Sequence, residues 1–216
     1  MTTNQTVAVI GLGNIGQAVA ANLSKSGRVF IAADRNLEKA KTFSEQCGAN
    51  AKPRDIASAV KNAGIVILSI PFEAIADFLK DYKKDLEGKI IIDPSNPIAP
   101  DENGGFKKII DSNASAGQIN SALLPNEAKL VKALGTLGVA SLTEAAYQSP
   151  EKAVLFYASD DKSIDTEVEK LIRDNGFQAL RIGGIDQSIR IEVFGDLHEF
   201  GALGKTVNLS EAKTKI

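Results

Sequence analysis

The chain has 216 residues, of which 44% are hydrophobic and 24% charged, as in an ordinary globular protein. Its formal net charge of −2 gives no electrostatic basis for binding nucleic acid or an anionic membrane surface. A single cysteine, Cys47, and a single histidine exclude an intramolecular disulfide and argue against a zinc site.

The sequence carries no signal for membrane insertion or secretion. No segment approaches the roughly 18 consecutive apolar residues of a transmembrane helix. The first residues, MTTNQT, lack the basic and apolar regions of a signal peptide. We therefore expect a cytoplasmic protein with no membrane partner.

A glycine motif directly follows the first apolar run. Residues 7–10 (VAVI) predict a strand buried on both faces, and the next six residues are Gly11, Leu12, Gly13, Asn14, Ile15 and Gly16. In a Gly-x-Gly-x-x-Gly turn, the glycines permit a tight turn, close approach of a pyrophosphate and close packing of the next helix. The amides at the start of that helix attract phosphate, so we expect a dinucleotide site here.

Strands then alternate with helices, which predicts parallel strands joined by right-handed crossovers. We expect further strands over residues 29–33, 49–52, 65–70 and 89–93. The helices expected between and after them cover residues 15–23, 37–47, 55–62 and 72–80. Nearly continuous apolar runs in the strands indicate a sheet covered on both faces.

The second half of the chain is less regular. We expect a long loop over residues 98–116, a helix ending near residue 124, strands over 129–134, 153–158 and 177–182, and helices over 163–175 and 185–204. Residues 136–150 give no clear prediction. The fold class is α/β: a Rossmann-type, doubly wound, mainly parallel sheet with a small C-terminal α/β lobe. We place the nucleotide-binding domain at residues 1–145 and the lobe at 146–216, with one compact domain as the alternative.

The residues after the second strand give conflicting signals about the cofactor. Asp34 suits the ribose hydroxyls of NAD and repels the 2′-phosphate of NADP. Arg35 and Lys39 can instead pair with that phosphate. Alternatively, both cations are solvated helix charges, paired with Glu38 or Asp34.

Two polar loops follow other strands of the predicted sheet. One contains Ser69, Ile70 and Pro71, and the other contains Ser95, Asn96 and Pro97. Ligands bind at the carboxyl ends of parallel strands in open α/β sheets. We therefore expect both loops to approach the nicotinamide half of the cofactor.

Several segments, in this order, resemble the coenzyme F420-dependent NADP oxidoreductase family: VAVIGLGNIGQAVAANL, ADRNLEKA, VILSIPFEAI, IIDPSNPI, KLVKALGTLG, YASDD and GFQALRIGGIDQSIRIE. The chain is also similar to the cytosolic domains of six-transmembrane epithelial metalloreductases, and its N-terminal half to pyrroline-5-carboxylate reductases. The resemblance implies a Rossmann domain with a small C-terminal lobe and an acceptor ring lying against the nicotinamide between them.

The resemblance also assigns individual residues. Arg35 and Lys39 match family positions that hold the 2′-phosphate, whereas Asp34 stands where the family has a serine. Leu134 and Gly135 stand in place of the family's phenylalanine and asparagine beside the deazaflavin pocket, which adds both to the expected cofactor site.

These observations predict an NAD(P)H-dependent oxidoreductase that transfers a hydride to a flavin or deazaflavin-type acceptor. NADP(H) is favoured and NAD(H) is a second candidate. The cofactors supply this chemistry, so we expect no catalytic side chain and no metal, only hydride transfer by proximity. We expect His198 to be a packed or surface residue, or else a contact to the acceptor or a second subunit. A homodimer is expected through the predicted helix that carries His198 and Phe200.

Two alternatives remain open. One is an imine reductase of the pyrroline-5-carboxylate reductase type, against which the strands expected at 153–158 and 177–182 argue. The other is a non-catalytic, NADP-sensing Rossmann protein.

Overall fold

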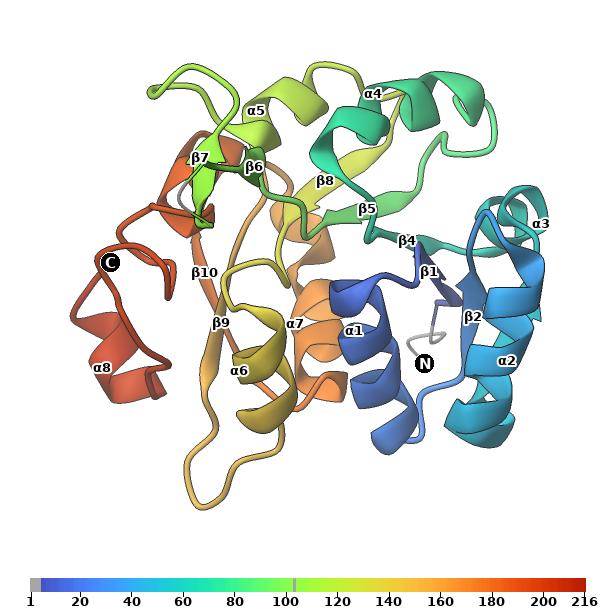
Figure 1. Ribbon diagram of the computed structural model, residues 1–216, viewed down its shortest axis with the longest axis horizontal. Coiled ribbons are helices and arrows are strands. Elements are labelled where there is room, and N and C mark those ends of the chain that lie inside the picture. Colours follow the sequence, from blue (N-terminus) through green and yellow to red (C-terminus); the bar gives the residue numbers. More distant parts are fainter. Residues whose placement is uncertain (1–4, 103) are drawn as a thin grey trace.

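An eight-stranded, mainly parallel sheet is the centre of the computed structural model, which describes residues 5–102 and 104–216 (Figure 1). Residues 1–4 of the polar N-terminal segment and residue 103 of the expected loop lie outside the described residues. The strand order is β10-β9-β8-β5-β4-β1-β2-β3, which confirms the predicted Rossmann-type α/β fold. The strands of this sheet are β1 (Val7–Ile10), β2 (Phe30–Ala33), β3 (Ala51–Arg54), β4 (Ile65–Leu68), β5 (Ile90–Asp93), β8 (Lys129–Lys132), β9 (Val154–Ala158) and β10 (Gln178–Gly183).

Helices join these strands. They are α1 (Asn14–Lys25), α2 (Leu37–Cys47), α3 (Ile56–Asn62), α4 (Phe72–Asp81), α5 (Ala116–Ser121), α6 (Val139–Glu144), α7 (Asp165–Asp174) and α8 (Leu209–Lys213), with 3₁₀ turns at Gly48–Asn50, Lys162–Ile164 and Ile185–Ile191. In the part of the chain that the structure describes, no helix has the length and apolarity needed to span a bilayer.

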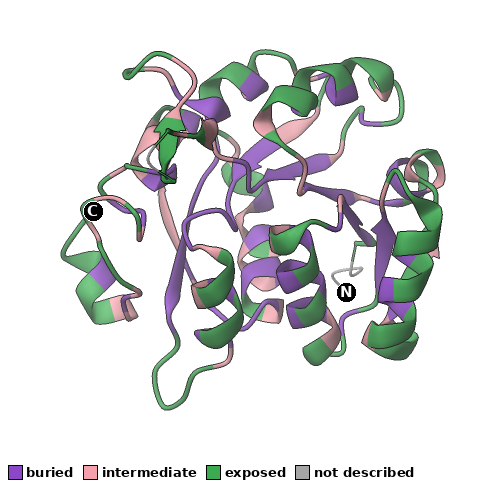
Figure 2. Cartoon of the chain, in the orientation of Figure 1, coloured by how far each residue is buried: buried purple, intermediate pink, exposed green. Residues whose placement is uncertain are grey.

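Alternate side chains of the parallel strands enter two separate cores. In β1, Val7 and Val9 join the cluster beneath α1, α2 and α7, whereas Ala8 and Ile10 join the cluster beneath α3 and α4. The two faces of the sheet are therefore both covered, which explains why the strands are apolar throughout. Figure 2 shows the central strands buried and the outer surfaces of the helices exposed.

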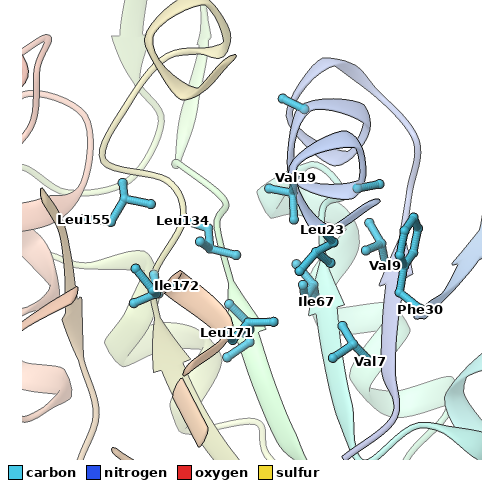
Figure 3. Close-up of a cluster of buried hydrophobic side chains, with 14 of the residues drawn as sticks. Val7, Val9, Val19, Leu23, Phe30, Ile67, Leu134, Leu155, Leu171 and Ile172 are labelled. Atoms are coloured by element: carbon cyan, nitrogen blue, oxygen red, sulfur yellow. The ribbon is translucent and has the colours of Figure 1, made fainter. Parts of the chain in front are cut away.

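The second half of the chain continues the same sheet. Strand β9 runs antiparallel to β8, meeting it at Lys132 and Ala158, and β10 runs parallel to β9. The cluster in Figure 3 contains Val7 and Val9 of β1 together with Leu155 of β9 and Leu171 of α7. Neither the sheet nor this core is interrupted at residue 145.

Several element boundaries differ from the prediction. The third strand begins at Ala51 instead of residue 49, and β8 ends at Lys132 because Leu134 adopts a positive φ of 65°. Residues 98–116 were expected to be a long loop, but they contain an antiparallel hairpin of β6 (Ile98–Pro100) and β7 (Phe106–Lys108). Such short strands carry little periodic signal in the sequence.

The prediction of a helix over 185–204 is wrong. A 3₁₀ helix covers Ile185–Ile191, and turns follow. A Cβ atom at Gly195 would collide with the carbonyl oxygens of Ile189 and Arg190, so the chain doubles back there. The apolar residues at helical spacing do not share one face. Ile185 belongs to the cluster that contains residues of α4, whereas Leu197 belongs to a cluster that contains residues of β9.

Candidate functional site

The glycine loop between β1 and α1 has the geometry of a phosphate cradle. Gly11 has a φ of +88°, and a Cβ there would collide with the Ser69 carbonyl. A Cβ at Gly16 would overlap the Gly11 carbonyl, so the start of α1 packs directly on the loop. At Gly13, in contrast, no described atom lies within 4 Å of an added Cβ. This open side, and a first turn of α1 that no described side chain caps, leave amides available for a pyrophosphate.

Asp34 is held at the end of β2 by three contacts. Its carboxylate accepts hydrogen bonds from the Leu12 amide at 2.9 Å and the Asn36 amide at 3.0 Å, and lies 3.5 Å from the Lys39 ammonium. Burial raises the pKa of Asp34, but the two amides and Lys39 together outweigh this and lower it below its usual value. Lys39 is thus paired with Asp34, one of the two arrangements considered from the sequence, whereas Arg35 is exposed and forms no ion pair with any described residue.

The structure adds a cation that the sequence analysis missed. Arg54 is the last residue of β3 and pairs in register with Ala33, the residue before Asp34. It is exposed, and its guanidinium donates to the neighbouring Pro53 carbonyl at 3.0 Å. Only the pairing of β2 with β3 places it at the edge where Arg35 lies, so spacing in the sequence gives no signal for it.

A cavity of about 840 Å³ extends from the glycine loop along the carboxyl ends of β4, β5 and β8. Nine of the residues expected at or near the cofactor line it: Gly13, Asn14, Ile15, Ser69, Ile70, Pro71, Ser95, Asn96 and Gly135. The structure does not bring two others to it. Leu134 is fully buried in the main core, and Pro97 is buried in its loop. Gly11, Leu12 and Gly16 shape the turn instead, and Asp34, Arg35 and Lys39 lie beyond the cavity at the end of β2.

The far side of the cavity is apolar and partly exposed. Phe106 of β7, Val139 of α6, and Phe194 and Phe200 of the C-terminal segment line it, with exposed fractions of 56%, 40%, 52% and 59%. Aromatic side chains stack favourably against other flat rings, so this rim suits a planar ligand. We call these four residues the apolar rim. Their convergence from three separate segments could not be read from the sequence.

A buried ion pair holds the loop after β5. Asp93 and Lys132 are partners in the β5–β8 register, with side chains 0% and 3% exposed and 3.1 Å between Lys132 Nζ and Asp93 Oδ2. Asp93 also accepts hydrogen bonds from the Ser95 amide at 2.8 Å and from Asn120 at 2.9 Å. The Lys132 ammonium donates to the Ser95 carbonyl. Both charges are thus satisfied, and the backbone of Ser95 is fixed on both sides.

Asn96 and His198 join this loop to the rest of the cavity wall. Asn96 donates to the Gly135 carbonyl at 3.1 Å and accepts from the Val193 amide at 2.7 Å. His198 contacts the same Gly135 carbonyl through Nε2 at 2.9 Å, and its Nδ1 accepts from the Phe200 amide at 3.0 Å. A carbonyl can only accept and an amide only donate, so His198 is the neutral tautomer protonated on Nε2. Burial lowers the pKa of His198 more than the hydrogen bond to Gly135 raises it. The pKa therefore lies below the usual value of 6.5.

Comparison with known proteins finds similarity to nicotinamide-linked reductases. The family model "NADP oxidoreductase coenzyme F420-dependent" matches residues 6–97. An F420-dependent NADP reductase from Methanothermobacter marburgensis is 25% identical over 86% of this chain and 87% of its own. The resemblance to the coenzyme F420-dependent NADP oxidoreductases is confirmed.

Solved structures agree with this fold. A hypothetical protein from Sinorhizobium meliloti is 28% identical, covers 94% of each chain and superposes with a TM-score of 0.81. A pyrroline-5-carboxylate reductase from Coxiella burnetii shares the fold at 17% identity and a TM-score of 0.62, over 90% of this chain but 65% of its own. That enzyme therefore has a portion with no counterpart here.

Gly13 and Gly16 should respond differently to substitution. Gly13→Val should fold, because the site is open and the backbone is extended, but should lose dinucleotide binding by at least tenfold because the side chain occupies the pyrophosphate position. Gly16→Ala should instead destabilise the fold, because its Cβ overlaps the Gly11 carbonyl. Thermal unfolding and titration with NADPH separate the two effects. A folded Gly13→Val variant with normal affinity would remove the motif from the site.

The Asp93–Lys132 pair should be sensitive to the loss of one partner. Lys132→Met should lower the free energy of unfolding by about 3–5 kcal/mol, since it leaves a buried carboxylate unpaired. Adding Asp93→Asn should recover part of the loss, because the amide oxygen still accepts from Ser95 and no charge remains. Urea denaturation measures both variants. A free energy of unfolding for Lys132→Met within about 1 kcal/mol of the wild type would show that the ion pair contributes little to stability.

His198 should make stability depend on pH in a defined window. The folded-state pKa lies below the unfolded value of 6.5, so the unfolded chain binds the proton first. Stability should therefore fall as pH decreases from 6.5 towards the folded-state pKa. His198→Gln keeps a donor for Gly135 and does not titrate, so its urea midpoint should be flatter across the same range. Equal pH profiles for the two proteins would contradict this assignment.

Proposed function

We propose that the chain is an NADPH-dependent oxidoreductase that transfers a hydride between the nicotinamide and a flavin or deazaflavin-type acceptor. The observation that carries this proposal is a single cavity that joins the phosphate cradle at Gly13 to the apolar rim. One end suits a dinucleotide and the other a flat ring. The family comparison supports both halves of the proposal.

The residues act by binding and positioning. A bound nicotinamide supplies a hydride to the acceptor ring, and proximity accounts for the rate. The amides at the start of α1 hold the pyrophosphate, and the loops at Ser69 and Asn96 form the floor of the nicotinamide end. The apolar rim holds the acceptor and excludes water. His198 transfers no proton, because both of its ring nitrogens are occupied.

The two parts of the chain divide this work. Residues 1–145 supply the dinucleotide site, and residues 146–216 complete the acceptor site through Phe194 and Phe200. We place the protein in the cytoplasm and retain a homodimer as a prediction for light scattering. A dimer would not form through a helix, because the segment that carries His198 and Phe200 consists of turns.

The preference for NADP(H) or NAD(H) depends on the balance of negative and positive charge at the end of β2. Asp34 is already neutralised by Lys39 and held by the Leu12 amide, which reduces its repulsion of a 2′-phosphate. Arg35 and Arg54 lie beside it with exposed guanidinium groups. This arrangement favours NADP(H) and leaves NAD(H) as a weaker competitor.

Arg35→Ala should weaken NADPH binding by about tenfold, the loss expected for one charge-assisted hydrogen bond to phosphate. NADH binding should change less than twofold, because NADH lacks that phosphate. Fluorescence titration of both cofactors measures the difference. Lys41→Ala, on the outer face of α2, is a matched control that should affect neither cofactor. Unchanged NADPH affinity in Arg35→Ala would remove Arg35 from the site.

Acceptor tests decide between the proposal and its alternatives. NADPH absorbance should fall when FMN, FAD or a deazaflavin is added to the wild-type protein. Oxidation with a cyclic imine and with none of these rings would favour an imine reductase. Binding of NADPH without oxidation by any acceptor would favour the sensor.

A further inference from the structure

Three buried hydroxyl groups near the cavity have no hydrogen-bond partner among residues 5–102 and 104–216. They belong to Ser69 after β4, Ser95 after β5 and Thr136 after β8. An unsatisfied buried polar group costs about 1–3 kcal/mol. Native proteins seldom retain such groups unless a ligand, a water or a functional demand explains them. Their clustering at the carboxyl ends of three neighbouring strands points to a ligand.

Ser95 is the most constrained of the three. Its amide donates to Asp93 at 2.8 Å and its carbonyl accepts from Lys132, so the buried ion pair fixes its backbone. The residue is 8% exposed and lines the cavity. Its remaining freedom is rotation about χ1, which sets the direction of the hydroxyl. The loop therefore holds an unpaired donor and acceptor in place before any ligand arrives.

The residues around Ser95 indicate which chemical group would bind there. Ser69 also lines the cavity, from the opposite loop, and its hydroxyl is likewise unpaired. Two hydroxyls in a mostly apolar wall suit a neutral group with both an acceptor and a donor, because each hydroxyl can donate or accept. A primary amide has both, whereas a phosphate would bind better at the amides of α1.

We propose that the Ser95 hydroxyl accepts a hydrogen bond from the amide nitrogen of the nicotinamide carboxamide and so sets which face of the ring is turned towards the apolar rim. This rests on the proposed function, since it assumes that a nicotinamide cofactor occupies the cavity. Ser95 is then a cofactor-positioning residue, a role that the sequence analysis gave to its loop as a whole and not to this hydroxyl. Ser69 is the second partner of the same amide.

A cofactor analogue tests the contact without any turnover. The 3-acetylpyridine analogue of NADP⁺ replaces the amide nitrogen with a methyl group and so loses the donor. Calorimetric titration of the wild type should give an affinity for NADP⁺ about tenfold higher than for the analogue, the effect of one hydrogen bond. In Ser95→Ala this ratio should fall to within twofold, while the affinity for the analogue stays the same.

Two further variants keep the result interpretable. Ser44→Ala removes another buried, unpaired hydroxyl, on α2 and outside the cavity, so it should keep the tenfold ratio. Ser69→Ala should reduce the ratio in part. All three variants should unfold at or above the wild-type temperature, because each removes an unsatisfied group.

The outcomes distinguish failure of the Ser95 contact from failure of the proposed function. A tenfold ratio retained in Ser95→Ala overturns the assignment, including the case in which Ser69→Ala alone abolishes it. A wild type that binds neither dinucleotide overturns the proposed function itself. Collapse of the ratio in Ser95→Ala, with the ratio kept in Ser44→Ala, supports the contact.

Discussion

The buried ion pair between Asp93 and Lys132 is the constraint on which the site depends. It joins neighbouring strands at their carboxyl ends, where the cofactor end of the cavity begins. A desolvated pair is stable only when its remaining hydrogen-bonding capacity is filled, and here the Ser95 backbone and Asn120 fill it. The same requirement that satisfies two buried charges therefore fixes the loop that carries Ser95 and Asn96.

That fixed loop is linked to the C-terminal segment. Asn96 bridges Gly135 and the Val193 amide, and His198 holds Gly135 from the other side. Phe194 and Phe200 follow directly from these anchors, which is why the apolar rim faces the cavity although it is largely exposed. The Asp93–Lys132 pair thus positions the loop with Asn96. The hydrogen bonds of Asn96 in turn position the segment that carries part of the apolar rim.

The sequence predicted the part of the molecule where local chemistry determines structure. Buried strands and the glycine turn at residues 11–16 have periodicity and spacing that tertiary contacts do not override. The C-terminal segment could not be predicted in this way, because the apolar residues at helical spacing over 185–204 pack into two different clusters. Arg54 and the apolar rim were missed for a related reason: only strand pairing or chain reversal brings them to the site.

The central claim is that this cavity holds two rings in contact for direct hydride transfer. It is tested most directly with NADPH carrying deuterium at nicotinamide C4 and 5-deazariboflavin as acceptor, because a hydrogen at the acceptor's C5 does not exchange with water. The account predicts that mass spectrometry finds the deuterium in the reduced deazaflavin, from one of the two C4 positions only. Deuterium released to the solvent, or no reduction of the acceptor, would contradict it.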